Sequence, residues 1–324
     1  MSGGEFALIE RYFSTLTAAR DDVLLGVGDD CALLRPPSGQ ALAVSIDTLV
    51  EGRHFSPGID PAALGHKALA VGLSDLAAMG AEPAWCTLAL TLPRVEHAWL
   101  AGFAEGLAAL AGRYRVGLVG GDTTKGPRSV SIQVHGFVPP AQALRRAGAR
   151  PGDLVYVTGT LGAAGLALLV RQGLFVAPEH LPELFGRLDR PEPRVAAGLA
   201  VRGLVSAAID VSDGLAADLG HVCAASGVGA TLYLDQLPCG PGVRAYIDET
   251  GDWHLPLGAG DDYELCLCVP PDRQGEFEAI AAGWRHRATW VGTVEQAPGV
   301  RVLGPDGAGV VVDAGGFDHF ADEA

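Results

Sequence analysis

Lysine is nearly absent from this chain. Lys67 and Lys125 are the only two among 324 residues, and arginine supplies the rest of the positive side-chain charge. No G-x-x-x-x-G-K-[ST] run occurs, which excludes a P-loop as the means of binding a nucleotide. Basic residues are also outnumbered, with 23 lysines and arginines against 38 acidic residues and a formal net charge of −15. Since no basic stripe offsets this charge, we expect no nucleic-acid partner.

Cysteines and long apolar runs are scarce as well. The six cysteines are scattered without a C-x-x-C pair, which indicates reduced, buried thiols rather than a disulfide framework. No stretch of about 18 apolar residues occurs, so we expect no membrane span. The first residues, MSGGEFALIERYF, lack the apolar segment of a secretory signal. These absences favour a cytoplasmic protein that binds no membrane.

The chain is rich in apolar residues, at 48% hydrophobic, and is long enough for two domains. Helical spacing of apolar residues predicts helices over 6–16, 61–80 and 97–114. Runs rich in β-branched residues predict strands over 41–50, 84–92 and 129–138. A turn-like Ala-Arg-Pro-Gly-Asp segment suggests a boundary between domains at 1–148 and 149–324. Mixed strands and helices in both halves predict α+β or α/β layers in each domain.

Three local predictions concern glycine and aspartate. The segment RPPSGQ is predicted to join strands in GVGDDCALL (26–34) and ALAVSIDTLV (41–50) as a hairpin. The strand in GLVGGDTT (117–124) is predicted to end in a glycine turn whose N–H groups approach a phosphate. In DVSDGL (210–215), Ser212 or Asp213 is predicted to cap a helix, with Ser212 donating to a phosphate near the helix N-terminus.

A set of aspartates recurs at the ends of predicted strands, in surroundings poor in lysine and arginine. Its members are Asp30, Asp47, Asp75, Asp122, Asp210 and Asp213. A buried carboxylate without a partner costs several kcal/mol or takes up a proton, and divalent cations remove that cost. Oxygen ligands without histidine or cysteine favour Mg²⁺. The set therefore predicts magnesium-dependent chemistry on a polyphosphate, and the metals would let an acidic protein bind an anionic nucleotide.

Eight segments in order carry a resemblance to a known family. They are VGDDCALL, DTLVEGRHF, LSDLAAMGA, GLVGGDTTKGP, PGDLVYVTGTLG, DVSDGLAADLGH, GAGDDYELC and GGFDHF. From about residue 4 to 320 the chain resembles the thiamine-monophosphate kinases, which share a superfamily with aminoimidazole ribonucleotide synthetase and selenophosphate synthetase. The resemblance implies ATP-dependent phosphorylation of thiamine monophosphate with several Mg²⁺ ions. It also implies an α+β fold of two domains, with a C-terminal α/β domain and an N-terminal α+β domain whose sheet pairs with that of a second subunit in a homodimer.

The resemblance also implies roles for single residues. The implied metal ligands are Asp30, Ser45, Ile46, Asp47, Asp75, Asp122, Asp210 and Asp213, and Asp30, Asp122 and Asp210 carry the catalytic role. The implied nucleotide site comprises Tyr114, Gly121, Asp122, Arg146 and Ser212, and the implied substrate site comprises His54, Glu264 and Phe317. Structural roles are the alternatives: a solvated charge for Arg146, a turn for His54 and packing of the tail for Phe317. Tyr114 is left open between the two.

The chain departs from the family pattern at three points. Ile46 stands where threonine is common, so a metal contact there can use only the backbone oxygen. Gly72 replaces the asparagine usual before LSD, which removes a side-chain hydrogen bond near Asp75. The loop TLGAAGL is shorter and less polar than the usual version. None of these changes removes an aspartate of the set.

The two Gly-Asp-Asp segments are predicted to act differently. In the first, Asp30 is the metal ligand, and Asp29 is a turn residue or an outer-shell residue of the metal site. In the second, Glu264 faces the acceptor substrate while Asp261 and Asp262 shape the loop. Two rival functions stay open, namely a related ATP-dependent synthetase of the same superfamily and a non-catalytic ligand-binding homologue. Cys31 follows the metal motif rather than lying in a flexible loop, which disfavours a selenophosphate synthetase.

Overall fold

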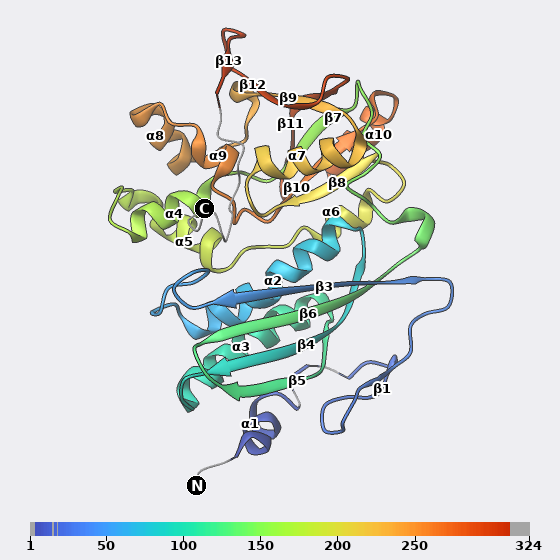
Figure 1. Ribbon diagram of the computed structural model, residues 1–324, viewed down its shortest axis with the longest axis vertical. Helices are drawn as coiled ribbons and strands as arrows, with labels where there is room; N and C mark the ends of the chain where they lie inside the picture. The colour runs from blue at the N-terminus through green and yellow to red at the C-terminus, as the bar shows by residue number, and fades with distance from the viewer. Residues whose placement is uncertain (1–3, 15, 18, 312–324) are drawn as a thin grey trace. The chain divides into compact units, whose positions relative to one another are not determined.

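Figure 1 shows the computed structural model of the chain, which describes residues 4–14, 16–17 and 19–311. Phe317, a predicted substrate residue, lies outside this range. The chain forms two compact units: residues up to Leu76 with Ala81–Pro140, and Ala77–Gly80 with the residues from Ala141 on. The units divide between Pro140 and Ala141. The sequence prediction placed the boundary later in the chain, after residue 148. In the described ranges no helix is both long and apolar enough to cross a membrane.

The first unit is a four-stranded sheet with two long helices on one face (Figure 1). Its elements are α1 (Glu5–Tyr12), β1 (Val23–Leu25), β2 (Leu33–Leu34), β3 (Ala41–Val50), α2 (Pro61–Ala78), β4 (Glu82–Leu92), α3 (His97–Tyr114), β5 (Gly117–Lys125) and β6 (Ser129–Val138). The strand order is β3-β6-β4-β5, antiparallel except for the β4–β5 pair. Alternation along β6 buries Val130, Ile132 and Val134 on the helix side.

The other face of this sheet is partly open. On β3, Leu42, Val44 and Ile46 are exposed by 46%, 50% and 62%. At one end the short β1–β2 pair covers this face, where Val23 and Leu34 pack against a cluster that includes Trp85. The predicted hairpin is therefore wrong, because β2 pairs with β1 and β3 pairs with β6. The two prolines of RPPSGQ lack N–H donors, and the chain leaves the small sheet there instead of folding back.

The second unit has a seven-stranded sheet in the order β13-β12-β9-β11-β7-β10-β8. Its strands are β7 (Leu154–Thr158), β8 (Ala207–Val211), β9 (Gly229–Tyr233), β10 (Glu264–Val269), β11 (Ala288–Glu295), β12 (Gly299–Leu303) and β13 (Gly309–Val310). Its helices are α4 (Ala163–Arg171), α5 (Leu181–Asp189), α6 (Val195–Ala200), α7 (Leu215–Ser226), α8 (Pro241–Thr250), α9 (His254–Gly258) and α10 (Gln274–Ala281). The pairing is antiparallel except between β9 and β12.

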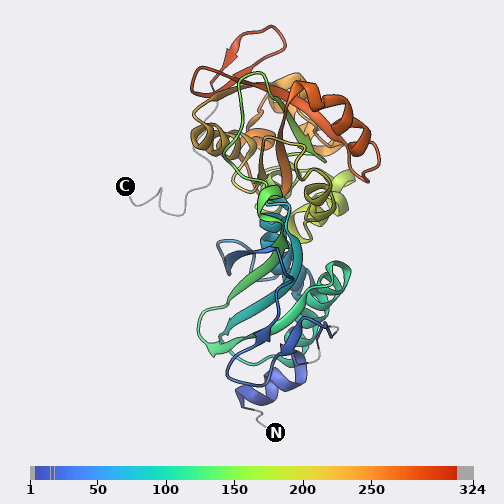
Figure 2. The same cartoon turned by 90° about the vertical axis from the view of Figure 1, so that its right-hand side faces the viewer.

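Helices cover both faces of this second sheet. Val155 and Val157 on β7 share a core with Leu219 on α7. Tyr156, between them, points to the other face and contacts Phe277 on α10, with 4.7 Å between ring centroids. Figure 2 shows α10 (orange) along one side of the sheet. Helices α4, α5 and α8 form a separate small core. Both units thus combine sheets and helices, which confirms the predicted α+β class.

Candidate active site

Ser45, Asp47 and Asp75, three of the predicted metal ligands, lie together in the first unit. The Ser45 hydroxyl on β3 donates a hydrogen bond to Asp75 Oδ2 on α2. Asp47 follows two residues later on the same face of β3, and its charge interacts with that of Asp75. Ile46 points the opposite way, with 62% of its surface exposed. Only the backbone oxygen of Ile46 is therefore available for its predicted role.

One carboxylate oxygen of this group has no partner. Asp47 Oδ2 is buried and accepts no hydrogen bond from the described part of the chain. Burial, followed by the charge of Asp75, raises the pKa of Asp47 to about 7. Such a carboxylate is costly unless a proton or a cation neutralises it. The oxygen atoms of Ser45, Asp47 and Asp75 therefore fit a hard cation such as Mg²⁺.

Gly72 lies next to the same oxygen. A Cβ atom at Gly72 would be 3.5 Å from Asp47 Oδ2 and 3.0 Å from Val134 Cγ1. The sequence predicted that glycine at this position removes a hydrogen bond near Asp75. In the structure Gly72 lies next to the unpartnered Oδ2 of Asp47. The carboxylate that lacks a side-chain donor from position 72 is therefore that of Asp47.

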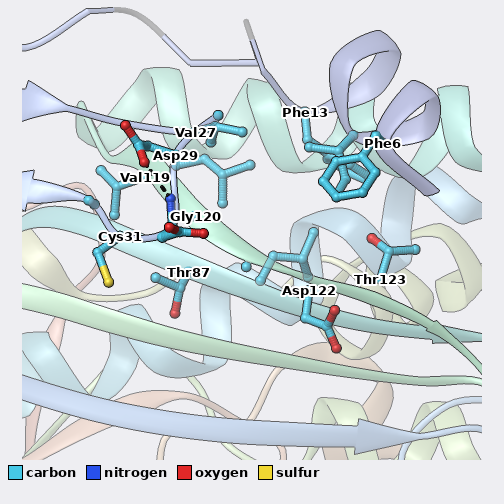
Figure 3. A pocket seen from close by; sticks show the side chains of 17 residues that line it. Phe6, Phe13, Val27, Asp29, Cys31, Thr87, Val119, Gly120, Asp122 and Thr123 are labelled. Atoms are coloured by element: carbon cyan, nitrogen blue, oxygen red, sulfur yellow. Dashed lines mark hydrogen bonds between the residues drawn. The ribbon is translucent and has the colours of Figure 1, made fainter.

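Asp30 and Asp122 lie at a second place in the first unit, a cavity of about 560 Å³ (Figure 3). Residues 27–32 and 120–123 supply its polar wall, and α1 adds Phe6, Ile9 and Phe13. In Figure 3, Phe6 and Phe13 lie on one side and Asp29 on the other. Asp29 Oδ1 accepts a hydrogen bond of 2.8 Å from the Asp30 N–H, so this carboxylate contacts the backbone beside the predicted metal ligand.

Gly121 lies inside β5 and not in a turn after it, so that prediction is wrong. β5 runs parallel to β4, and the register shifts between Cys86 and Thr87. At this shift Gly121 has a φ of 153°, and a Cβ atom on it would overlap the carbonyl oxygen of Leu88. Only glycine fits this close approach of two strands. Gly120 and Gly121 still line the cavity, as part of an edge strand.

The width of the sheet separates the two groups of carboxylates. Across β6 and β4, Asp47 on β3 is aligned with Gly121 on β5. Because neighbouring strands lie about 4.8 Å apart, three steps place Asp47 and Asp122 about 14 Å apart. Adjacent residues also alternate in face, so Asp122 leaves β5 on the side opposite to Asp47. Within the described ranges, no three acidic, histidine or cysteine side chains come together to hold one ion.

Two further predicted residues lie near these strands. His54 follows β3, and its Nδ1 accepts a hydrogen bond of 3.0 Å from the Val50 N–H, so the neutral ring carries its proton on Nε2. Tyr114 ends α3, and its ring lies 5.4 Å from the guanidinium carbon of Arg113. In the cavity as described, α1 and not Tyr114 supplies the aromatic rings. The contacts of both residues with a ligand stay predictions.

In the second unit, Asp210 is buried near the end of β8, and Ser212 and Asp213 follow it. The prediction that Ser212 or Asp213 caps α7 is wrong, since Gly214 precedes the helix and no side-chain cap forms. Asp218, in the first turn of α7, accepts hydrogen bonds from both backbone N–H groups instead, at 3.0 and 3.1 Å. These N–H groups are therefore occupied, and the Ser212 hydroxyl is left for the predicted phosphate contact.

Arg146 is exposed and lies close enough to this loop for its charge to act on Asp218. Burial raises the pKa of Asp218 to about 7, and the positive charge of Arg146 opposes that rise. The structure thus brings Arg146 near Ser212 and Asp213, its predicted companions in binding the nucleotide phosphates. A guanidinium there can donate to two phosphate oxygens at once.

The second Gly-Asp-Asp segment packs directly on the Ser212 loop. The N–H groups of Asp261 and Tyr263 donate to the carbonyl oxygens of Ser212 and Val211, both at 2.8 Å. Asp261 and Tyr263 both have left-handed backbones, with φ of 60° and 51°. A Cβ atom at Gly260 would overlap the Ser212 carbonyl oxygen. Such strain in non-glycine residues persists only where the surrounding contacts hold it.

Glu264, a predicted substrate residue, is 0% exposed. Its carboxylate accepts hydrogen bonds from Arg194 Nε and Nη2, both at 2.5 Å, from Arg187 Nη2 at 2.6 Å and from the Thr158 hydroxyl at 2.7 Å. Burial alone would raise the pKa of Glu264, but these donors hold it below its usual value. Both oxygens already have partners here, so the predicted contact between Glu264 and a substrate stays a prediction.

Sequence reasoning missed Asp218, Arg187 and Arg194. Asp218 is a third acidic residue in DVSDGLAADL, at helical spacing after the metal motif, and that spacing was a usable signal. Arg194 lies in the proline-rich segment DRPEPR, where nothing local indicates a partner. Arg187 and Arg194 meet Glu264 only through contacts that span 77 and 70 residues of sequence.

Burial of Asp262 makes the free energy of unfolding depend on pH. Burial raises the pKa of Asp262 from 3.8 to about 8, while its oxygens accept hydrogen bonds from the Gly162 N–H. Between these values the folded chain keeps a proton that the unfolded chain has lost. The free energy of unfolding therefore falls as pH rises, by at most about 1.4 kcal/mol per pH unit for this one group.

Asp262→Asn should make that fall shallower, since the amide keeps the acceptor and does not titrate. Asp47 and Asp218, each with a pKa raised to about 7, contribute equally in both proteins. Urea unfolding of the wild type and the variant, measured from pH 5 to pH 8, checks this difference. Glu264, with its lowered pKa, contributes only at more acidic pH and leaves this window unaffected. Parallel curves for the two proteins would show that Asp262 is ionised in the folded chain.

Two family models match the chain, the N-terminal domain of AIR synthase related proteins over residues 28–138 and the C-terminal domain over residues 150–304. The thiamine-monophosphate kinase of Salmonella typhimurium is 48% identical over 324 residues, which covers 99% of each chain. The thiamine-monophosphate kinase of Escherichia coli (strain K12) is 48% identical over 323 residues, with the same coverage.

Solved structures give the same picture. The thiamine-monophosphate kinase of Stenotrophomonas maltophilia K279a matches with a TM-score of 0.86 at 44% identity, covering 96% of this chain and 99% of that one. The structure of AaThiL complexed with AMPPCP and TMP matches with a TM-score of 0.75 at 31% identity, covering 98% of this chain and 97% of that one. The similarity thus extends over nearly the whole chain in both sequence and fold.

Proposed function

Since this chain belongs to the thiamine-monophosphate kinases, within the AIR synthase related proteins, we propose that it transfers the terminal phosphoryl group of ATP to thiamine monophosphate. The product is thiamine diphosphate. The observation that best supports this function within the chain itself is the cavity that joins Asp30 and Asp122 to the apolar wall of α1. A site for a nucleotide needs a polar end for the phosphates and an apolar wall for the base.

The nucleotide would bind in this cavity with its base toward α1. Phe6 is 84% exposed, which is unusual for a phenylalanine, and it lies beside Ile9 and Phe13 on the cavity wall. An aromatic base can pack on such rings. Asp30 and Asp122 lie at the polar end, where the phosphates and their metals would be held.

Magnesium is the metal we propose, held by Asp30 and Asp122 at the cavity and by Ser45, Asp47 and Asp75 beside α2. When bound, Mg²⁺ neutralises phosphate charge and aligns the phosphate oxygens. The all-oxygen donors and the unpartnered Asp47 Oδ2 support this assignment. Asp210 and Asp213 are the metal ligands that we propose in the second unit.

The chain's own groups would act by binding and positioning. The phosphate of thiamine monophosphate is already ionised at neutral pH, so no strong general base is needed. Arg146 and the Ser212 hydroxyl would bind the nucleotide phosphates, and His54 can donate through Nε2 to the acceptor. We therefore propose direct in-line transfer without a phosphorylated protein intermediate.

The open face of the first sheet supports a homodimer. The exposed apolar side chains of Leu42, Val44 and Ile46 make this face suited to a second copy. Asp122 projects on that open side and Asp47 on the helix side, so the two carboxylates would hold separate metal ions. We also propose a cytoplasmic location, which the six free cysteines support.

Phe6→Ala should weaken nucleotide binding with little effect on folding, because the ring is exposed. Loss of one stacking contact, about 1 kcal/mol, corresponds to about a fivefold higher KM for ATP. The KM for thiamine monophosphate should not change. Leu174→Ala, at a side chain that is 70% exposed and outside the cavity lining, is the matched control. Equal KM values for ATP in wild type and Phe6→Ala would place the base elsewhere.

The experiment that tests the function is ATP consumption with different acceptors. We expect turnover with thiamine monophosphate and Mg²⁺, and none with free thiamine or with aminoimidazole precursors. Turnover with an aminoimidazole precursor or selenide would favour a related synthetase. No turnover with any acceptor, in a protein that still binds ATP, would favour a non-catalytic homologue.

A further inference from the structure

Asp218 is a buried acidic residue that none of the roles above uses. It is 2% exposed in the first turn of α7, and its Oδ2 accepts the N–H groups of both Ser212 and Asp213. One oxygen thus holds two consecutive peptide groups at the N-terminal end of the helix. Gly214 provides no side-chain cap for α7, and Asp218 instead reaches back from the first turn to the residues before the helix, as the acidic residue of a capping box does.

These two hydrogen bonds fix the backbone orientation of residues 212 and 213. Two N–H groups that converge on one atom leave their peptide planes little freedom. The directions in which the side chains of Ser212 and Asp213 leave the chain are set by those planes. Without the carboxylate, two N–H groups would lie in a partly buried loop without an acceptor, and the loop would rearrange to satisfy them.

The opposite side of the same segment is held by other contacts. The carbonyl oxygens of Val211 and Ser212 accept the N–H groups of Tyr263 and Asp261. Asp218 is therefore the support on the helix side, and the strained Gly260–Tyr263 loop is the support on the other. Removing Asp218 frees one side only, so the segment can shift without loss of the surrounding sheet.

We infer that Asp218 is a positioning residue for nucleotide binding, which holds Ser212 and Asp213 where they can meet the phosphates and their metal. This inference rests on the proposed function for the roles of Ser212 and Asp213. It assigns to Asp218 no contact with ligand. What matters is the position of its acceptor oxygen, and its negative charge is not required.

Two conservative variants separate position from charge. Asp218→Asn loses the charge but keeps an oxygen at the same distance, and we expect kinetics within about threefold of the wild type. Asp218→Glu keeps the charge but moves the carboxylate by one methylene, and we expect a fall in kcat of about a hundredfold, the cost of a misplacement of about 1 Å. In Asp218→Glu the KM for Mg-ATP should rise about tenfold, with the KM for thiamine monophosphate unchanged.

Asp153→Ala is the matched control. Asp153 is likewise buried, and its Oδ2 accepts the Arg150 N–H at 2.8 Å and the Ser206 hydroxyl at 2.5 Å, away from both loops. We expect a lower Tm for this variant with wild-type KM values. The reverse ranking, with Asp218→Asn impaired and Asp218→Glu active, would overturn the inference, as would wild-type kinetics in Asp218→Glu.

Binding of a non-hydrolysable ATP analogue with Mg²⁺ keeps this test independent of the acceptor. We expect a Kd about tenfold higher for Asp218→Glu than for wild type and Asp218→Asn. If the wild type fails to phosphorylate thiamine monophosphate but this ranking of Kd holds, the proposed function fails and the role of Asp218 stands. If the wild type is active and the three Kd values are equal, the role of Asp218 fails alone.

Discussion

Asp47→Asn and Asp122→Asn should each lower kcat by about a hundredfold or more, because each variant lacks one carboxylate that neutralises phosphate charge. Dimers mixed from the two variants should stay inactive after subunit exchange. A second sheet across the open face lies on the side opposite to Asp47, so Asp122 of another copy does not reach the metal that Asp47 would hold. Steady-state assays before and after exchange measure any recovery.

The control for this experiment is a mixture that cannot recover. Asp30 and Asp122 line the same cavity in one chain, so Asp30→Asn mixed with Asp122→Asn leaves every site defective. Asp29→Asn should stay near wild type, because the amide oxygen still accepts the Asp30 N–H. Recovery of about a quarter of the wild-type kcat in the Asp47/Asp122 mixture alone, after proven exchange, would show instead that the site is shared between subunits.

Arg194→Met should lower the free energy of unfolding by about 3–5 kcal/mol. Glu264 is 0% exposed, and Arg194 supplies two of its four hydrogen bonds while being only 5% exposed. Loss of one member of a buried pair leaves the other charge without compensation, and Arg187 alone cannot replace a bidentate partner. Urea unfolding at neutral pH, followed by tryptophan fluorescence and by circular dichroism, measures the change.

Arg171→Met is the matched comparison in the same unit. Arg171 pairs with Asp189 at 2.5 Å, and their side chains keep 25% and 19% exposure, so water can replace the lost partner. We expect a cost of about 1 kcal/mol or less. Equal costs for the two variants would mean that Glu264 reaches water, and the predicted contact between Glu264 and the substrate would gain support.

The long helices and central strands follow from the sequence because their signals are local. The apolar spacing over 97–114 matches α3 residue for residue, and the run over 41–50 matches β3. These segments bury one face along their whole length, so the pattern alone determines the element. The α+β class and the two-part organisation follow from the same signals.

Pairing and site geometry do not follow from the sequence in this way. The partner of β3 is β6, with paired residues 79 to 97 positions apart, and no local pattern distinguishes it from the nearby segment around Leu33. Gly120 and Gly121 predict a turn on composition, but a close approach to β4 requires the glycine inside a strand. The sequence shows which aspartates are candidate ligands, but strand order decides which edge of the sheet each one occupies. The pairing of β3, the place of Gly121 and the grouping of the aspartates all depend on contacts between residues distant in sequence.

Side chains alternate between the two faces of the sheet along β3. Ser45 and Asp47 face the helices, and Val44 and Ile46 face the open side of the sheet. A one-residue insertion or deletion within Ala41–Val50 would exchange the two sets, placing a carboxylate on the face proposed for the second subunit and isoleucine at the proposed metal site. Assembly and catalysis would then fail in the same mutant. We therefore expect natural length variation in this chain to spare this strand and to fall in the loops around it.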